Sequence, residues 1–159
     1  MRTWMCLLAM ACGAEEGMSG LDTAMMDDGP VFDEPLTTIN GEVPPGTLLP
    51  LQDVIVLIDT IQDDGNRLVV TKGTRLAGTR VGIHVHKYGG HTCVMSGEIT
   101  DFVEGMPNGT FPTDTCYYMP ANVPMAPANL GTEDAILIDT FILPPGEPTI
   151  TILEPGWDF

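Results

Sequence analysis

The chain has 159 residues and a formal net charge of -16, from 22 acidic residues against 6 Lys and Arg. A field of that sign repels phosphate backbones and anionic lipid headgroups, so the composition argues against nucleic-acid binding. Hydrophobic residues make up 43% of the chain and charged residues 18%, which is typical of a globular protein, and the length fits one domain. The 18 Gly and 14 Pro favour many turns and short elements, as in all-β proteins.

The N-terminal segment has the pattern of an export signal. Arg2 precedes a short apolar run from Trp4 to Ala11, and Cys12 follows. This order resembles a bacterial lipoprotein signal, and the run is too short to span a bilayer, which takes about 20 apolar residues. We predict a signal over residues 1–12 with a lipid on Cys12, and an exported protein that meets the membrane only through this anchor. The alternative is an ordinary cytoplasmic N-terminus.

Residues 13–45 contain many acidic residues and prolines and too little apolar surface to fold alone. We expect a flexible acidic linker there, followed by one folded domain over residues 46–159. In that domain, runs rich in β-branched residues alternate with Gly, Pro, Asn and Asp turns. We predict strands over residues 53–62, 67–73, 78–86, 91–96, 98–105, 114–120, 121–129, 134–146 and 148–155. Their number and spacing predict an antiparallel sandwich or barrel, and Asn108-Gly109 predicts a hairpin turn.

All three histidines of the chain fall within eight residues, at His84, His86 and His91. Strand side chains alternate between faces, so the stretch from residue 78 to residue 86 places Arg80, His84 and His86 on one face. Two imidazoles two residues apart on one face can share a metal ion. Gly89-Gly90 lets the chain turn, so that His91 approaches the same face from the next strand.

Two motifs resemble those of the cupin superfamily, which are double-stranded β-helix (jelly-roll) barrels with a metal site in the lumen. Gly78 is followed by five residues, His84-Val85-His86 and, eleven residues after His86, Gly97. The second motif matches from Pro120 to Asn129 in spacing. The resemblance covers about residues 53–143 and implies an all-β cupin barrel behind the acidic leader.

The same resemblance implies a set of metal ligands. The glutamate position of the family falls on Gly90 with His91 beside it, and its last histidine position falls on Met125. We predict His84, His86 and His91 as ligands, with Met125 as a weak fourth, for a divalent transition metal (Fe, Cu, Ni, Mn or Zn). The hypothesis is a metal-dependent dioxygenase or isomerase that acts on a small molecule without a nucleotide cofactor. The alternative is a non-catalytic ligand-binding or sensing barrel that has lost its metal chemistry.

Three further side chains are candidates for the pocket. Arg80 shares the face of the histidine pair and can bind a carboxylate there, or be solvated near the barrel mouth. One of the neighbours Tyr117 and Tyr118 must face the lumen, and we assign Tyr117. Asp139 lies within an apolar run and requires a hydrogen-bonding partner if it is buried, for which a histidine is one candidate. Otherwise it faces solvent near a sheet end.

Two more expectations come from the resemblance. Cys93 and Cys116 lie on segments that pair or neighbour each other in cupin barrels, so they form either a disulfide, in an exported protein, or two small buried apolar side chains. Single-domain cupins are often homodimers, and the resemblance assigns Val81, Ile83 and Val85 to an outer apolar face that is compatible with such an interface.

Overall fold

The computed structural model describes residues 32 and 34–158, and the predicted lipoprotein signal with Cys12 lies outside them. The elements in this part of the chain are eleven strands and no helix: β1 (Thr47–Leu48), β2 (Gln52–Ile61), β3 (Arg67–Arg75), β4 (Thr79–Arg80), β5 (His84–Val85), β6 (Gly90–Ser96), β7 (Glu98–Asp101), β8 (Gly109–Pro112), β9 (Thr115–Met119), β10 (Ala135–Leu143) and β11 (Thr151–Ile152). The described residues therefore contain no helix long and apolar enough to cross a membrane.

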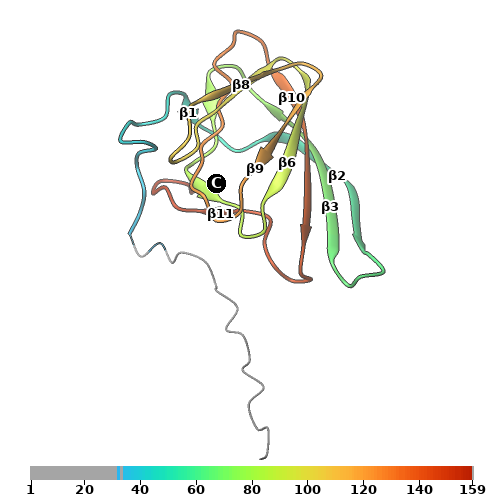
Figure 1. The fold of residues 1–159 in the computed structure, drawn as a ribbon. Coiled ribbons are helices and arrows are strands. Elements are labelled where there is room, and N and C mark those ends of the chain that lie inside the picture. The colour runs from blue at the N-terminus through green and yellow to red at the C-terminus, as the bar shows by residue number, and fades with distance from the viewer. Residues whose placement is uncertain (1–31, 33, 159) are drawn as a thin grey trace, which may run out of the picture.

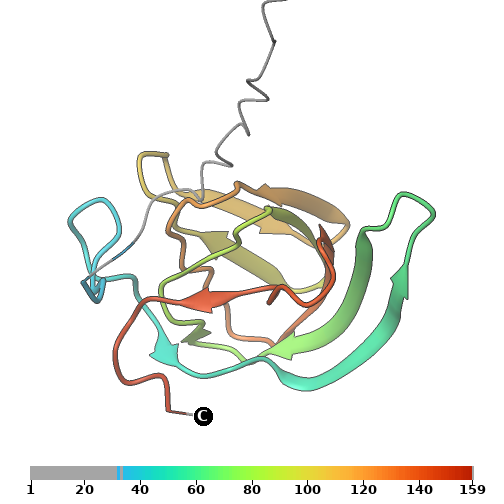
Figure 2. The ribbon, with the colours of Figure 1, turned by 90° about the horizontal axis from the view of Figure 1, so that it is seen from below.

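One five-stranded sheet, in the order β2-β3-β10-β6-β9, forms one wall of the molecule. Three two-stranded sheets, β1-β4, β5-β11 and β7-β8, complete the wall opposite. Figure 1 shows the large sheet on one side with β11 crossing below it, and Figure 2 shows the strands arranged around a common centre. The fold is all-β, and its strands wind around a lumen as a double-stranded β-helix does.

The predicted strand over residues 78–86 is split in two. β4 and β5 are separated by Val81, Gly82 and Ile83, which belong to no strand. The segment over residues 121–129 is joined to its neighbours by single bridges, such as His84 to Met125, and forms no continuous strand. The Asn-Gly prediction is also displaced, because the β7-β8 loop runs from residue 102 to residue 108 and Gly109 already pairs with Asp101.

The prediction of a flexible linker is wrong for its last ten residues. The Leu36 N–H donates to the Leu153 carbonyl at 3.1 Å, and Ile39 pairs with Glu42 in a tight turn. Ile39 is 3% exposed and packs with Ile83 in a small apolar cluster. The polar composition of this segment predicts a linker, but two apolar side chains, Leu36 and Ile39, are enough to pack it against the barrel.

The outer face predicted for a dimer is not available in this chain. Val81, Ile83 and Val85 are all buried, at 7% exposure or less. The largest group of exposed apolar side chains in the described residues lies instead on the edge strand β2, whose hairpin with β3 extends away from the barrel in Figure 2. The homodimer remains a prediction.

Cys93 and Cys116 face each other across β6 and β9, and their sulfurs are bonded at 2.05 Å. The bond closes a loop of 23 residues, which in the chain-entropy estimate corresponds to about 3 kcal/mol of stability. We expect the Cys93→Ser/Cys116→Ser protein to lose about that much free energy of unfolding in urea. A reducing agent should lower the stability of the wild type and leave the double variant unchanged. Equal stability of the oxidised and reduced wild type would contradict the expectation.

Candidate ligand cavity and histidine pair

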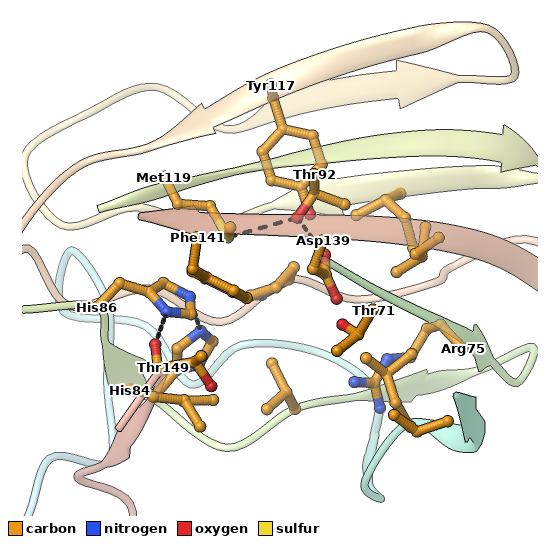
Figure 3. A pocket seen from close by; sticks show the side chains of 17 residues that line it. Thr71, Arg75, His84, His86, Thr92, Tyr117, Met119, Asp139, Phe141 and Thr149 are labelled. Atoms are coloured by element: carbon orange, nitrogen blue, oxygen red, sulfur yellow. Dashed lines mark hydrogen bonds between the residues drawn. The ribbon is translucent and has the colours of Figure 1, made fainter. Parts of the chain in front are cut away.

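A cavity of about 270 Å³ lies inside the barrel, against the inner face of the large sheet. Most of its wall is apolar, and Thr149 and Ile150, just before β11, close one side. Figure 3 shows two groups of polar side chains that face it from opposite ends. The polar lining residues are Thr71, Arg75, His84, His86, Thr92, Tyr117, Asp139 and Thr149. An apolar cavity with a few convergent polar groups is the usual form of a small-molecule site.

The first polar group is the histidine pair of β5 and the residue after it. His84 is 2% exposed and His86 4% exposed. The His84 Nδ1 lies 2.8 Å from the Gly82 carbonyl, and the His86 Nδ1 lies 2.6 Å from the Thr149 carbonyl. The two Nε2 atoms lie 3.1 Å from each other (Figure 3). Main-chain carbonyls therefore fix both rings, and both Nε2 atoms point to one spot.

These three contacts need three protons, and two neutral imidazoles carry only two. Each Nδ1 faces a carbonyl, which only accepts, so each Nδ1 holds a proton and both Nε2 atoms present lone pairs. Burial, together with the nearby His86 and Arg75, lowers the pKa of His84 to about 3, and burial lowers the pKa of His86 as well. Burial thus opposes a third proton, and two lone pairs that converge in this way are able to accept a cation.

His91 does not join this pair, so the predicted three-histidine site is wrong. It is exposed on the face of β6 opposite to buried Thr92, and its ring packs 5.2 Å from that of Tyr118. Among residues 32 and 34–158, no three His, Cys, Asp or Glu side chains are grouped so that they can hold a metal ion. His91 follows Gly90 directly in β6, and one residue of register decides which face a strand side chain takes.

The other two ligand positions of the cupin motif are filled by apolar groups. A Cβ at Gly90 would lie 2.7 Å from the Phe141 ring, so this ring occupies the space of any side chain there. Met125 is fully buried and is paired with His84 through both main-chain hydrogen bonds. Its side chain belongs to the apolar core and is not among the residues that line the cavity. Coordination by Met125 therefore stays a prediction.

The motif positions themselves have the backbone that the resemblance implies. Asn122 stands where the second cupin motif, which begins with proline, any residue and glycine, has its glycine, and its φ of 56° is the left-handed conformation. Asn129 is fully buried and binds the carbonyls of Arg75 and Glu133 through its amide nitrogen, at 3.0 and 2.8 Å. The second motif therefore acts structurally here, by holding the end of β3 beside the segment that precedes β10.

The second polar group lies at the other end of the cavity and consists of Arg75, Asp139, Thr92 and Tyr117. The Thr92 hydroxyl donates to Asp139 Oδ1 at 2.6 Å, and the Tyr117 ring stacks on that of Phe111. Tyr117 and Asp139, predicted for the pocket, both line it, and the partner of Asp139 is a threonine rather than a histidine. Burial raises the pKa of both side chains.

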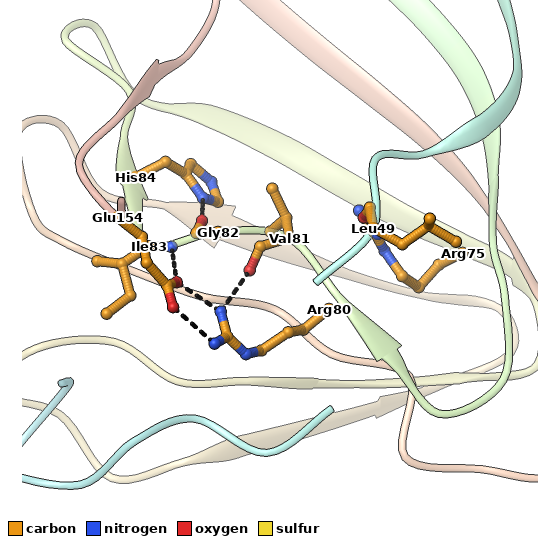
Figure 4. A network of polar contacts seen from close by, with 8 residues as sticks. All are labelled: Leu49, Arg75, Arg80, Val81, Gly82, Ile83, His84 and Glu154. Atoms are coloured by element: carbon orange, nitrogen blue, oxygen red, sulfur yellow. Dashed lines mark hydrogen bonds and ion pairs between the residues drawn. The ribbon is translucent and has the colours of Figure 1, made fainter. Parts of the chain in front are cut away.

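Arg80 points away from the cavity, so its assignment to the pocket is wrong. It is 4% exposed and forms a two-pronged ion pair with Glu154, with distances of 2.6 and 2.7 Å (Figure 4). The break between β4 and β5 shifts the alternation, so Val81 lines the cavity together with His84. The buried arginine of the cavity is Arg75 on β3. Period-two alternation from buried Val69 through Gly73 would have found it.

The large sheet and the three two-stranded sheets wind around a lumen as a double-stranded β-helix, which is the fold of the cupin proteins, and the histidine pair faces this lumen. No family model and no curated protein matches the sequence. Solved structures do match. A protein with a double-stranded β-helix domain from Klebsiella pneumoniae is 18% identical over 79% of this chain and 89% of its own, with a TM-score of 0.50. A cupin-like protein from Thermotoga maritima is 19% identical over 64% and 74%, with a TM-score of 0.51.

The DMSP lyase DddQ from Ruegeria pomeroyi is 16% identical over 67% of this chain, with a TM-score of 0.53. This chain spans about half the length of the DMSP lyases it matches, 53% of DddQ and 43% of another. At identities this low, the structural matches establish the shared fold alone. The function of the site must be argued from its own residues.

Proposed function

We propose that this protein binds a small molecule inside the barrel, and that His84 and His86 hold a divalent transition-metal ion which the bound molecule contacts. The observation that carries the proposal is the convergence of the two Nε2 lone pairs, 3.1 Å apart, on rings fixed by main-chain carbonyls. Metal-ligating histidines commonly donate their other ring N–H to such a carbonyl, which fixes the tautomer. The structural neighbours that are DMSP lyases are consistent with a small-molecule ligand.

The donor pair fits one side of a coordination sphere. Metal–nitrogen bonds of about 2.0–2.1 Å place two ligand nitrogens about 2.9–3.4 Å apart when they subtend an angle between square and tetrahedral. The Nε2 atoms fall in this range. A metal held by two imidazoles keeps several positions for water or for a ligand oxygen, which it would polarise. Such a site suits a dioxygenase or an isomerase that acts on a small oxygenated molecule.

A metal-free binding or sensing barrel is the second candidate. The observation that favours it is the absence, in the described part of the chain, of a third His, Cys, Asp or Glu beside the pair. The Phe141 ring against Gly90 points the same way, because it fills a ligand position with carbon. Both candidates use the same cavity, and they differ in whether a metal ion binds at the histidine end. Export and a lipid on Cys12 remain proposals about residues outside the described part.

Metal titration of the full chain distinguishes the two candidates. After treatment with a chelator, we expect one Zn²⁺, Ni²⁺ or Cu²⁺ ion to bind per chain in calorimetry. The His84→Ala/His86→Ala variant should bind at least about 100-fold more weakly, because loss of a group that only hydrogen-bonds a ligand already costs about 10–100-fold. His91→Ala is the matched control, since its imidazole faces solvent on the outer side of β6, and it should bind as the wild type does. Equal metal affinity in the double variant and the wild type would contradict a metal site at the histidine pair and favour the metal-free binding or sensing barrel.

A further inference from the structure

We infer that the Arg75 end of the cavity binds a carboxylate, so that the ligand is a small monocarboxylic acid with an apolar body. This inference rests on the part of the proposed function that makes the cavity a ligand site. It does not depend on a metal at the histidine pair, because the two polar groups lie at opposite ends of the cavity (Figure 3).

Arg75 is a buried cation that forms no ion pair with an acidic side chain of the described residues. It is 3% exposed, and one Nη donates to the Leu49 carbonyl. No carboxylate oxygen of the described chain lies within ion-pair distance of its guanidinium, in contrast to Arg80, which binds Glu154 with both Nη atoms. Arginine is almost never buried unless it is paired, because removing a charge from water is costly. The Arg75 guanidinium borders the cavity, so a ligand anion can supply the missing partner there.

Asp139 does not supply it. The Asp139 carboxyl faces the same cavity and already accepts the Thr92 hydroxyl at 2.6 Å. Its oxygens lie beyond ion-pair distance of the Arg75 guanidinium. Burial raises the pKa of Asp139, while the Thr92 hydrogen bond and the charge of Arg75 act in the opposite direction.

The anion is a carboxylate rather than a phosphate. Arg75 is the one cationic side chain among the described residues that line the cavity. A guanidinium matches the two oxygens of a carboxylate with two parallel hydrogen bonds and balances its single charge. A doubly charged phosphate would remain uncompensated inside an apolar wall, and burial of an unpaired charge is strongly unfavourable.

The rest of the cavity sets the body of the ligand. Leu51, Val54, Ile99 and Leu137 contribute aliphatic surface to its wall. Its volume of about 270 Å³ is slightly below the usual range for drug-sized ligands, so the ligand is the size of a small metabolite. A carboxylate on Arg75 directs the opposite end of such a molecule toward His84 and His86.

The test compares acids with their amides, which have nearly the same shape and no charge. We would measure the thermal unfolding midpoint of the full chain, with a chelator present, against increasing butanoate, hexanoate or benzoate and the three matching amides. Ligands that bind the folded state raise this midpoint, and the shift gives the affinity. We expect at least one acid to bind about tenfold or more tightly than its amide, as a charge-assisted pair implies.

Substitutions then locate the effect. Arg75→Met should remove the preference for the acid, and Arg75→Lys should retain part of it. Arg67→Met is the matched control, because Arg67 pairs with Asp59 on the exposed β2-β3 hairpin, and it should keep the full preference. Should Arg75→Met fail to fold, the acid-to-amide ratio in the wild type still decides.

The inference is overturned if no acid binds more tightly than its amide, or if Arg75→Met keeps the preference. The same titration in the His84→Ala/His86→Ala variant separates this result from the metal proposal. An acid preference that persists there supports the carboxylate site even where no metal binds.

Discussion

Replacing Arg80 with alanine is expected to lower the free energy of unfolding by about 3–5 kcal/mol, the usual effect of breaking a buried ion pair from one side. The side chains of Arg80 and Glu154 are 5% and 8% exposed. Glu154 also accepts the Ile83 N–H at 2.8 Å, directly before His84 in the chain. Without Arg80, the carboxylate remains buried with one neutral donor. Figure 4 shows that the pair fastens the C-terminal segment to the loop that leads into the histidine pair.

Urea denaturation of four proteins tests this reasoning. Arg80→Lys keeps the charge but loses the two-pronged geometry, so it should fall between the wild type and Arg80→Ala. Arg80→Met/Glu154→Leu removes both charges and should be more stable than Arg80→Ala, because no uncompensated charge remains. A loss below about 1 kcal/mol in Arg80→Ala would show that the pair behaves like an exposed one. Separately, the metal affinity of Arg80→Ala would show whether the Arg80–Glu154 pair also positions His84.

Much of the fold could be predicted because it depends on patterns that act locally. Runs of β-branched residues between turn formers gave β2, β3, β6 and β10 to within a few residues. The two cupin motifs place backbone features that few residues satisfy. A Cβ at Gly97 would lie 2.9 Å from Ala135, at a φ of 77°, so this position excludes other residues. Such constraints are visible in a sequence because they restrict residue type.

The site was less predictable because its geometry depends on register between distant strands. His84 and His86 converge as period-two alternation requires, because the chain stays extended from β5 through the isolated bridge of His86 to Ala121. Alternation fails for Arg80 because the chain breaks between β4 and β5, and Gly82 within the break is the one local signal of it. His91 shows the same weakness, as Gly90 takes the inner face of β6 and His91 the outer. The face of His91 follows from the pairing of β6 with β9 and β10, and that of Arg80 from the break between β4 and β5.

We expect the stability of Asp101→Asn relative to the wild type to be greater at pH 8 than at pH 4. Asp101 on β7 is 3% exposed, and its Oδ1 has no hydrogen-bond partner. Burial raises its pKa to about 7, which the Phe102 N–H only partly opposes, against 3.8 for the ordinary side chain. Between these values the unfolded chain releases the proton and the folded chain keeps it. Stability therefore falls as the pH rises from about 4 to 7, and it changes no further above that.

Asparagine cannot ionise, so the variant should lack this loss. A shift of three pKa units corresponds to roughly 4 kcal/mol. The free energy of unfolding of the variant minus that of the wild type should therefore increase by on the order of 2–4 kcal/mol from pH 4 to pH 8. Urea denaturation at both pH values measures it. The matched control is Asp59→Asn, because hydrogen bonds from Arg67 lower the pKa of Asp59 and its contribution has the opposite sign. A difference that does not vary with pH would mean that Asp101 is ionised in the folded protein, with water as its partner.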